Sequence, residues 1–233
     1  MRVAPMMALL ALLAGCGGVS STPDRATFTF DFGQGTQGWT TGFSDYSVGQ
    51  EQLLQLDSGL RNLPPPLDQN RTGILLSGNN HSDDLFMFLT GRLTGLKPYQ
   101  NYSLQVLVEF ATNAANGCLG VGGSPGESVF VKVGASPIEP QAQAVAGRYT
   151  MNLDKGNQAT GGSDAIVVGN IANGLTDCAN PVYTLKTLQN TQDTFTAKTG
   201  NQGTIWAMVG TDSGFEGTTA LYYTKIVVTL ESL

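Results

Sequence analysis

The sequence predicts an all-β fold, a sandwich of two antiparallel sheets with little helix. Apolar residues alternate with polar ones, as at Phe28, Phe30 and Phe32, which is typical of strands with one buried face. Clusters of Gly, Asn, Asp and Pro separate these short runs, as turns do between the strands of a sandwich. No window of eleven residues shows a helical apolar stripe with capping residues at its ends. Strands are expected at residues 27–32, 73–77, 85–93, 103–110, 128–134, 148–152, 165–171, 182–188, 194–198, 204–209 and 220–230.

The first fifteen residues have the layout of a signal peptide. One positive charge, Arg2, precedes an uncharged stretch whose apolar centre covers residues 7–13. That stretch is too short for a permanent span, because a hydrocarbon core of ~30 Å takes about 20 apolar residues. We therefore expect a signal peptide over residues 1–15, a tether over residues 16–26 and a single sandwich domain over residues 27–233.

The end of this segment, Leu13-Ala14-Gly15-Cys16, resembles the lipobox of bacterial lipoproteins at all four positions. The alternative is an ordinary secretory signal with a chance cysteine, which would need a cleavage site elsewhere. The resemblance implies acyl chains, such as palmitate, on Cys16 and a lasting attachment to a bilayer. Gly17 follows in place of an acidic residue, which favours an outer-membrane or outward-facing location. The protein is thus expected to be exported and lipid-anchored to the cell membrane or outer membrane.

Two cysteines remain once Cys16 is assigned to lipid. Cys118 and Cys178 both lie in turn-like contexts, and a pair of cysteines in an oxidising compartment favours a disulfide. A metal site is the weaker alternative, since these two residues and the sole histidine, His81, lack the close spacing of a zinc motif.

The composition excludes one class of partner. The formal net charge is -6 and no cluster of Lys or Arg occurs, so a nucleic acid would find no basic surface. Only 13% of the residues are charged, which suits a secreted, turn-rich sandwich better than a disordered chain.

Both ends of the expected domain resemble a known fold. Residues 30–40, FDFGQGTQGWT, are similar to the opening of galactose-binding-like jelly rolls and their carbohydrate-binding modules, and residues 220–228 are similar to their final strand. The resemblance implies a jelly roll whose first and last strands lie close together. Many members hold a structural calcium through acidic residues in those two strands. Here the last strand reads Thr224-Lys225, which departs from that pattern and leaves only Asp31 on the other side.

Two further segments, residues 77–88 and 210–219, resemble parts of a group of uncharacterised bacterial lipoproteins. That resemblance implies membership of a family of exported proteins and no particular activity.

Two polar segments are candidates for ligand binding. The first offers amides, an imidazole and carboxylates, a mixture that binds calcium or sugar hydroxyls, and its members are Asn79, Asn80, His81, Asp83 and Asp84. Its alternative is a polar connection that satisfies its own backbone. In the second, Asp212 and Glu216 lie four residues apart, and a loop could turn both carboxylates inward.

Calcium is the one cofactor that the sequence suggests. Asp154, Asn157 and Asp164 lie in a loop of acids and amides that could surround the ion. The spacing does not match an EF-hand, and Lys155 interrupts the acidic pattern.

Aromatic rings are a second requirement for sugar binding, because their faces stack on the C–H groups of pyranoses. The candidates are Tyr46, Tyr99, Tyr149, Tyr183 and Trp206. Trp39 and Trp206 have apolar flanks, which favours a place in the core instead.

Motifs for catalysis are missing from the sequence. It holds no Gly-x-Ser-x-Gly elbow and no His-Glu-x-x-His zinc site. The sequence therefore predicts a non-catalytic, membrane-anchored lipoprotein that binds a glycan or another ligand of the cell envelope. The alternatives are a structural or envelope-assembly lipoprotein with a protein partner and, third, a polysaccharide hydrolase or lyase that uses two of the carboxylates above.

Overall fold

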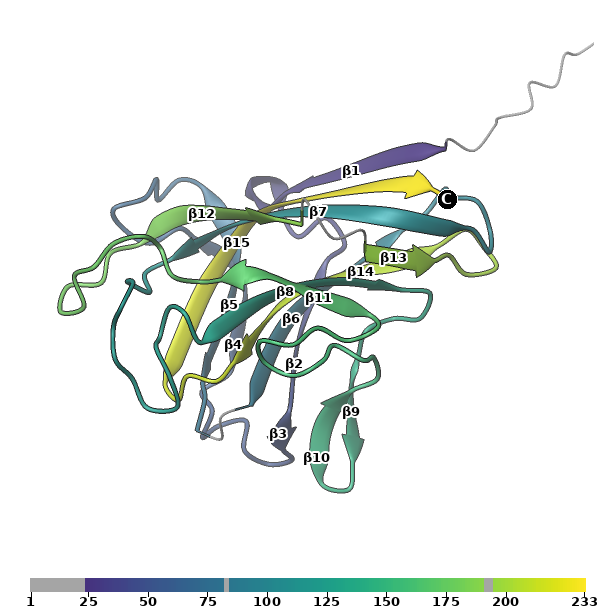
Figure 1. Ribbon diagram of the computed structural model, residues 1–233. Coiled ribbons are helices and arrows are strands. Elements are labelled where there is room, and N and C mark those ends of the chain that lie inside the picture. The colour runs from purple at the N-terminus through teal and green to yellow at the C-terminus, as the bar shows by residue number, and fades with distance from the viewer. Residues whose placement is uncertain (1–23, 82–83, 191–194) are drawn as a thin grey trace, which may run out of the picture.

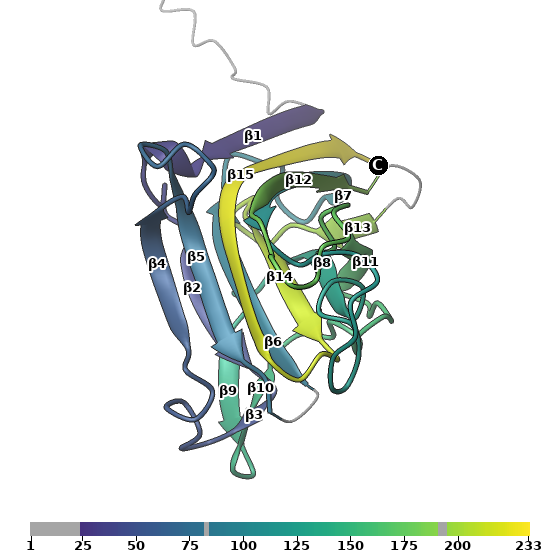
Figure 2. The ribbon, with the colours of Figure 1, turned by 90° about the vertical axis from the view of Figure 1, so that its left-hand side faces the viewer.

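The computed structural model describes residues 24–81, 84–190 and 195–233 (Figure 1). Within these residues the chain forms fifteen strands and one short 3-10 helix, η1 (Phe32–Gln34). The strands form two large antiparallel sheets that pack face to face, and a third, small sheet (Figure 2). The predicted all-β sandwich with little helix is confirmed.

The larger sheet, called sheet A here, has seven strands built around β15 (Thr218–Ser232). One edge of β15 pairs with β7 (Asn101–Thr112), while the other pairs with β5 (Thr72–Asn79) and then with β1 (Arg25–Asp31). The remaining three strands lie outside these: β4 (Asp57–Asn62) next to β5, and β12 (Thr184–Gln189) and β13 (Phe195–Lys198) next to β7.

The second sheet, sheet B, has five strands in the order β11-β8-β14-β6-β2. Their bounds are β11 (Ala165–Asn170), β8 (Val129–Ser136), β14 (Ile205–Ser213), β6 (Leu85–Leu93) and β2 (Thr40–Ser44). The small sheet, sheet C, joins β3 (Tyr46–Ser47), β10 (Arg148–Met151) and β9 (Ala142–Val145), and its β9–β10 hairpin extends from one end of the sandwich (Figure 1).

The core lies between sheets A and B and follows from the period of two along each strand. In β7, Leu104, Val106, Val108 and Phe110 all point inward and are buried. Each such side chain contributes roughly 1.5–3 kcal/mol through removal of its surface from water. The alternation that predicted the strands is therefore also what stabilises the sandwich.

The N-terminal motif forms a turn and part of the core. Asp31 Oδ1 accepts a hydrogen bond from Gly33 N at 3.0 Å and so caps η1. The Trp39 indole is 3% exposed and packs edge-on against Phe30 and Phe32, with ring centroids 5.3 and 6.1 Å away. Trp39 is thus a core residue.

The expected closeness of the first and last strands is also found. β1 pairs with β15, with Phe30 opposite Ile226 and Asp31 opposite Lys225. A lysine therefore stands where the resemblance would require a calcium-binding acid.

All eleven expected strands are present, with ends shifted by a few residues; β1, for example, begins at Arg25. The strands that the sequence pattern did not predict are β2, β3, β4 and β9. β4 and β9 are mostly exposed, so they lack the alternation that marks a half-buried strand. One expected loop is wrong, because residues 210–213 continue β14 and place Asp212 in a buried strand.

The predicted disulfide is present. Cys118 and Cys178 are bonded and join the connection between β7 and β8 to the connection between β11 and β12. Cys16 lies outside the described residues. Within the described residues, no helix has the length and apolar character needed to cross a membrane.

Candidate functional site

The outer face of sheet B, opposite the core, carries charged residues under a loop. In β14, Ile205, Ala207 and Val209 join the core, so Asp212 points away from it. In the register of β8 and β14, Lys132 lies opposite Gly210 and is therefore a diagonal neighbour of Asp212 on that outer face. Both side chains are fully buried. Residues 152–164, called the covering loop here, shield them from solvent.

A network of ion pairs fastens the covering loop to sheet B. Asp212 Oδ2 lies 2.9 Å from Lys132 Nζ and 2.8 Å from Lys155 Nζ, and it accepts a hydrogen bond of 3.0 Å from Gln158 N. Lys155 Nζ also lies 2.9 Å from Asp45 Oδ2. We call Lys132, Lys155, Asp45 and Asp212 the buried ion network.

Lys132 ties the loop to the sheet a second time through the backbone. Its Nζ donates to the carbonyl oxygens of Lys155 at 2.9 Å and Thr160 at 3.0 Å. A buried ammonium needs such partners, because an unpaired buried charge is strongly destabilising. The network therefore fixes the position of the loop.

The covering loop is also held by its own side chains. Asp154 accepts hydrogen bonds from Gly156 N at 3.1 Å and Ser163 N at 2.9 Å, while Asp164 Oδ2 accepts one from Asp154 N at 2.9 Å. Gly156 has a φ of 70°, and a Cβ there would lie 2.2 Å from the carbonyl oxygen of Thr160. Glycine is thus required at this turn.

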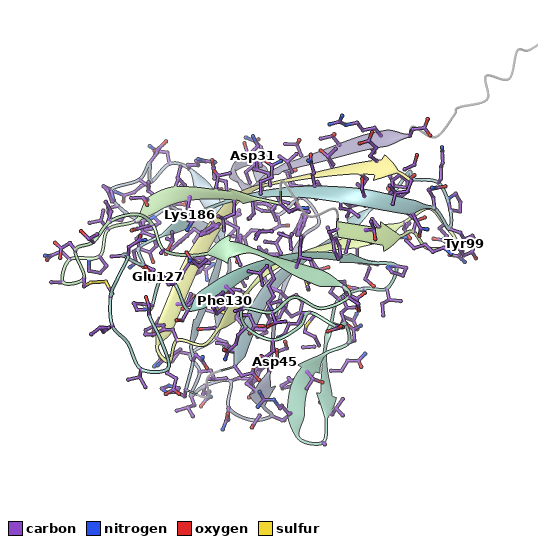
Figure 3. All side chains as sticks on the ribbon, in the orientation of Figure 1. Asp31, Asp45, Tyr99, Glu127, Phe130 and Lys186 are labelled. Atoms are coloured by element: carbon purple, nitrogen blue, oxygen red, sulfur yellow. A yellow bond between two sulfur atoms is a disulfide. The ribbon has the colours of Figure 1, made fainter. Side chains whose placement is uncertain are left out.

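An open cleft of about 250 Å³ lies beside the network, and we call it the polar cleft. Arg148 Nη2 stands near it and donates to Asp84 Oδ2 and to the Asp45 carbonyl oxygen, both at 2.6 Å. Asp45 lies toward the end of the molecule that carries the β9–β10 hairpin, away from β1 (Figure 3). The cleft is lined by Asp45, Asp84, Thr150, Met151, Leu153, Asp154, Lys155, Gly156 and Asn157.

The positive charge that lines the cleft points into the protein, away from solvent. Lys155 is the one lysine among the described residues that line the cleft. Its side chain is only 7% exposed, because it contacts Asp45, Asp212 and the carbonyl oxygen of Gly156. The accessible polar groups are therefore mainly carboxylate, amide and hydroxyl groups. Such a surface suits a ligand that brings hydrogen-bond donors.

Burial disfavours the charged forms of the aspartates and lysines around the cleft, whereas ion pairing favours them, so the two effects oppose each other in each pKa. Burial raises the pKa of Asp45, although Lys155 opposes it, and burial together with the charge of Asp45 raises the pKa of Asp84. Burial lowers the pKa of Lys132. Burial alone would also lower the pKa of Lys155, but the carboxylates of Asp212 and Asp45 outweigh it and raise that pKa.

The carboxyls of the cleft should titrate on either side of the ordinary aspartate value of 3.8. Asp45 and Asp84 should titrate above it, and Asp154 below it, because Ser163 N and Gly156 N stabilise the Asp154 carboxylate. Carboxyl ¹³C shifts followed by NMR across pH 2–7 provide the measurement.

A carboxyl with a raised folded-state pKa binds its proton more tightly when folded, so Asp45 and Asp84 should contribute less stability as pH rises from 3.8 through that pKa. If Asp45, Asp84 and Asp154 all titrated near 3.8, the burial of the first two and the hydrogen bonds of the third would be contradicted.

The structure brings some predicted site residues together and separates others. Asp84, Asp154 and Asn157 meet at the polar cleft, with Asp212 buried behind Lys155. Asn80 and Glu216 lie elsewhere, at the turn between β14 and β15. Asn79 ends β5 opposite Thr218, and His81 is exposed. Asp83 lies outside the described residues.

Sequence reasoning missed four residues of the site: Asp45, Lys132, Arg148 and Lys155. One signal was available, since Lys132 occupies the centre of an otherwise apolar strand, Phe130-Val131-Lys132-Val133. A charge at such a position requires a buried partner. The sequence pattern suggested that Lys155 interrupts a calcium loop, whereas Lys155 forms ion pairs with both Asp45 and Asp212.

The suggested calcium ligands serve first as backbone caps. Both Asp154 and Asp164 accept hydrogen bonds from N–H groups of the covering loop. Among the described residues, no three acidic, histidine or cysteine side chains are grouped so as to hold a metal ion. Calcium binding with the help of Asn157 stays a prediction.

None of the aromatic candidates is among the described residues that line the cleft. Tyr46 is buried against Tyr149, with ring centroids 5.0 Å apart, and Tyr183 packs edge-on against Tyr222 at 5.6 Å. Tyr99 is 65% exposed and lies at the right-hand edge of the molecule in Figure 3, apart from Asp45 in its lower part. Trp206 is half-buried.

No family model and no curated protein matches the chain. Among solved structures, it is similar to the enzymatically active domain of tailspike protein 4 of bacteriophage CBA120, with 12% identity and a TM-score of 0.36, over 84% of this chain and 19% of that chain. It is similar to TmCBM61, solved with β-1,4-galactotriose, with 8% identity and a TM-score of 0.39. This similarity covers 84% of this chain and 92% of that chain. It is also similar to the mannan-recognising carbohydrate-binding module TmCBM27, with 7% identity and a TM-score of 0.38. This similarity covers 88% of this chain and 97% of that chain. At these values, the function has to be inferred from the residues of this chain.

Proposed function

We propose that the protein is a non-catalytic, exported lipoprotein that binds a glycan of the cell envelope at the polar cleft. One observation carries this proposal: residues from three separate segments, at Asp45, at Asp84 and at residues 150–157, line one cleft, and most of their polar side chains carry hydrogen-bond acceptors. Sugar hydroxyls are donors that such acceptors bind, and Met151 and Leu153 add an apolar wall for the C–H groups of a ring.

The arrangement of charge favours neutral glycans and amino sugars over acidic ones. The carboxylates of Asp45, Asp84 and Asp154 line the cleft together with Lys155, whose ammonium is already paired with Asp45 and Asp212. A uronate or a sulfate would therefore approach carboxylates without meeting a free cation. The net charge of -6 would also repel a polyanion at long range.

Two features support the exported, lipid-anchored part of the proposal. The lipobox-like sequence ends at Cys16, and the Cys118–Cys178 disulfide suits an oxidising compartment. β1 begins at the end of the molecule opposite the β9–β10 hairpin (Figures 1 and 2). A tether in front of β1 would therefore let the cleft face away from the membrane.

Loss of an acceptor in the cleft should weaken glycan binding. The domain from Ser21 onward is screened on an array of neutral, amino-sugar and acidic polysaccharides, with calcium and with chelator. Asp84→Asn and Asn157→Ala should each lower the affinity for a bound glycan about tenfold, the size of one hydrogen bond to a charged group or somewhat less. Asp57→Asn is the matched control, because Asp57 also pairs with an arginine, Arg61, but lies on β4 of the other sheet.

The outcomes separate the components of the proposal. Binding that needs calcium would assign a role to Asp154, Asn157 and Asp164. Binding that survives chelator but weakens in the two cleft variants would support the cleft without a metal. Affinity unchanged in both variants would contradict the cleft as the site, and no binding on the array would favour a protein partner.

A further inference from the structure

A second cavity, chemically unlike the polar cleft, lies beside the disulfide. It is formed by the connection between β7 and β8, by the connection between β11 and β12, and by the turn between β14 and β15 together with the start of β15. Its volume is about 260 Å³, and the Cys118–Cys178 bond forms part of its wall. We call it the disulfide-walled pocket. It shares no lining residue with the polar cleft.

The walls of this pocket are held in place by more than the disulfide. Asn116 N donates to the Leu175 carbonyl oxygen at 2.6 Å, and Asn173 N donates to the Ala114 carbonyl oxygen at 2.8 Å. These bonds join the two connections that the disulfide also joins. A pocket with such walls loses little conformational freedom when a ligand enters.

The third wall, the turn that carries Phe215, is anchored as well. Asn80 Nδ2 donates to the carbonyl oxygens of Ser213 and Phe215, both at 3.0 Å, and Glu216 N donates to the Val121 carbonyl oxygen at 2.8 Å. Asn80 and Glu216, which the sequence suggested as ligand-binding residues, thus hold a wall of this pocket.

Two glycines fit around the Phe215 ring. A Cβ at Gly120 would lie 2.5 Å from Phe215 Cε2, and a Cβ at Gly217 would lie 2.5 Å from Phe215 Cζ. Any side chain at either position would displace the ring. The sequence therefore places the ring in one orientation at the side of the pocket.

The chemistry of the lining defines the ligand. Phe215, Ile171 and Ala220 supply apolar surface, Asn113 and Thr218 supply hydrogen-bonding groups, and none of the described residues that line the pocket is charged. We propose that the disulfide-walled pocket binds an uncharged ring with one apolar face and a hydrogen-bonding edge. Burying a charge there would be costly, because no lining side chain could pair with it.

Two kinds of ring share this chemistry, a neutral pyranose and a phenol-like aromatic ring. The experiment uses methyl β-galactoside and p-cresol as separate probes, each titrated into the ¹⁵N-labelled domain from Ser21 onward with its disulfide intact. Chemical shift changes should be confined to the amides of residues 113–126, 171–181 and 214–220. The probe that shifts these amides identifies the source of the ring.

Two variants test whether the pocket itself binds the probe. Ala220→Phe fills the pocket, and Val227→Phe is its control, because it makes the same type of change on the same strand away from the pocket. Leu119→Asp places a charge in the lining without a cost to folding, since Leu119 is fully exposed, and Leu53→Asp is its control. Both pocket variants should lower the affinity at least fivefold, and neither control should.

Absence of shifts at millimolar concentration of both probes would overturn the proposal. So would shifts elsewhere in the molecule, or affinity that is unchanged in both pocket variants. The polar cleft is tested by Asp84→Asn and Asn157→Ala, which leave this pocket intact, so the two proposals fail independently.

Discussion

Replacement of Asp212 by alanine is expected to destabilise the folded protein by about 3–5 kcal/mol. The substitution removes the carboxylate that lies within 3 Å of both Lys132 and Lys155, and it leaves two buried ammonium groups with Asp45 as their remaining acid. It also removes the acceptor of Gln158 N, so the covering loop should loosen. Urea unfolding followed by circular dichroism measures the first effect, and amide hydrogen exchange over residues 152–164 measures the second.

Asp57→Ala provides the comparison for Asp212. Asp57 also forms an ion pair, at 3.3 Å from Arg61, but both side chains are about half exposed, so its loss should change the unfolding free energy by less than about 1 kcal/mol. If the two variants unfold at the same urea concentration, the ion network does not fasten the covering loop.

Removal of the disulfide should have an effect of similar size. The bond joins residues 60 positions apart, and closing a loop of that length in the unfolded chain is worth roughly 4 kcal/mol. The double variant Cys118→Ala, Cys178→Ala should therefore melt about 10 °C below the oxidised protein, as measured by differential scanning calorimetry.

Thiol titration gives the control for this prediction. The oxidised domain from Ser21 onward should show no reactive thiol after denaturation without reductant and two after reduction. A melting temperature that is equal in the oxidised and the doubly substituted protein would show that the hydrogen bonds between the two connections suffice to hold them.

The sequence predicted the fold more completely than the site. Alternation marked strands such as β7 because their inner residues are buried in the core and their outer residues are mostly polar. It did not mark β4, whose residues are all at least partly exposed at the edge of sheet A. It also ended β14 too early, since Gly210-Thr211-Asp212-Ser213 resembles a turn locally and is buried only because β6 and β8 pair with it on both sides.

The candidate site depends on contacts between residues far apart in the chain. Asp84 and Asp154 could be singled out as local polar clusters, but their meeting at one cleft requires the sheet to bring β6 beside the covering loop. The role of Lys155 was even harder to predict from the sequence. A lysine among acids in a loop resembles a solvated charge, and only the register of β8 against β14 places Asp212 and Lys132 beneath it.

The position of β15 in the sheet constrains the order in which the chain can fold. β15 is the last strand along the chain, yet it lies inside sheet A, where β7, β5 and β1 all pair with it. A chain that emerges N-terminus first from a ribosome therefore cannot complete sheet A until residues 218–232 have followed. Until then the paired edges of β7 and β5 and the whole of β1 lack their shared partner, so sheet A forms only after the last strand has been synthesised. The same delay exposes those edges to other chains, so a factor that shields them would be most valuable just before β15 arrives.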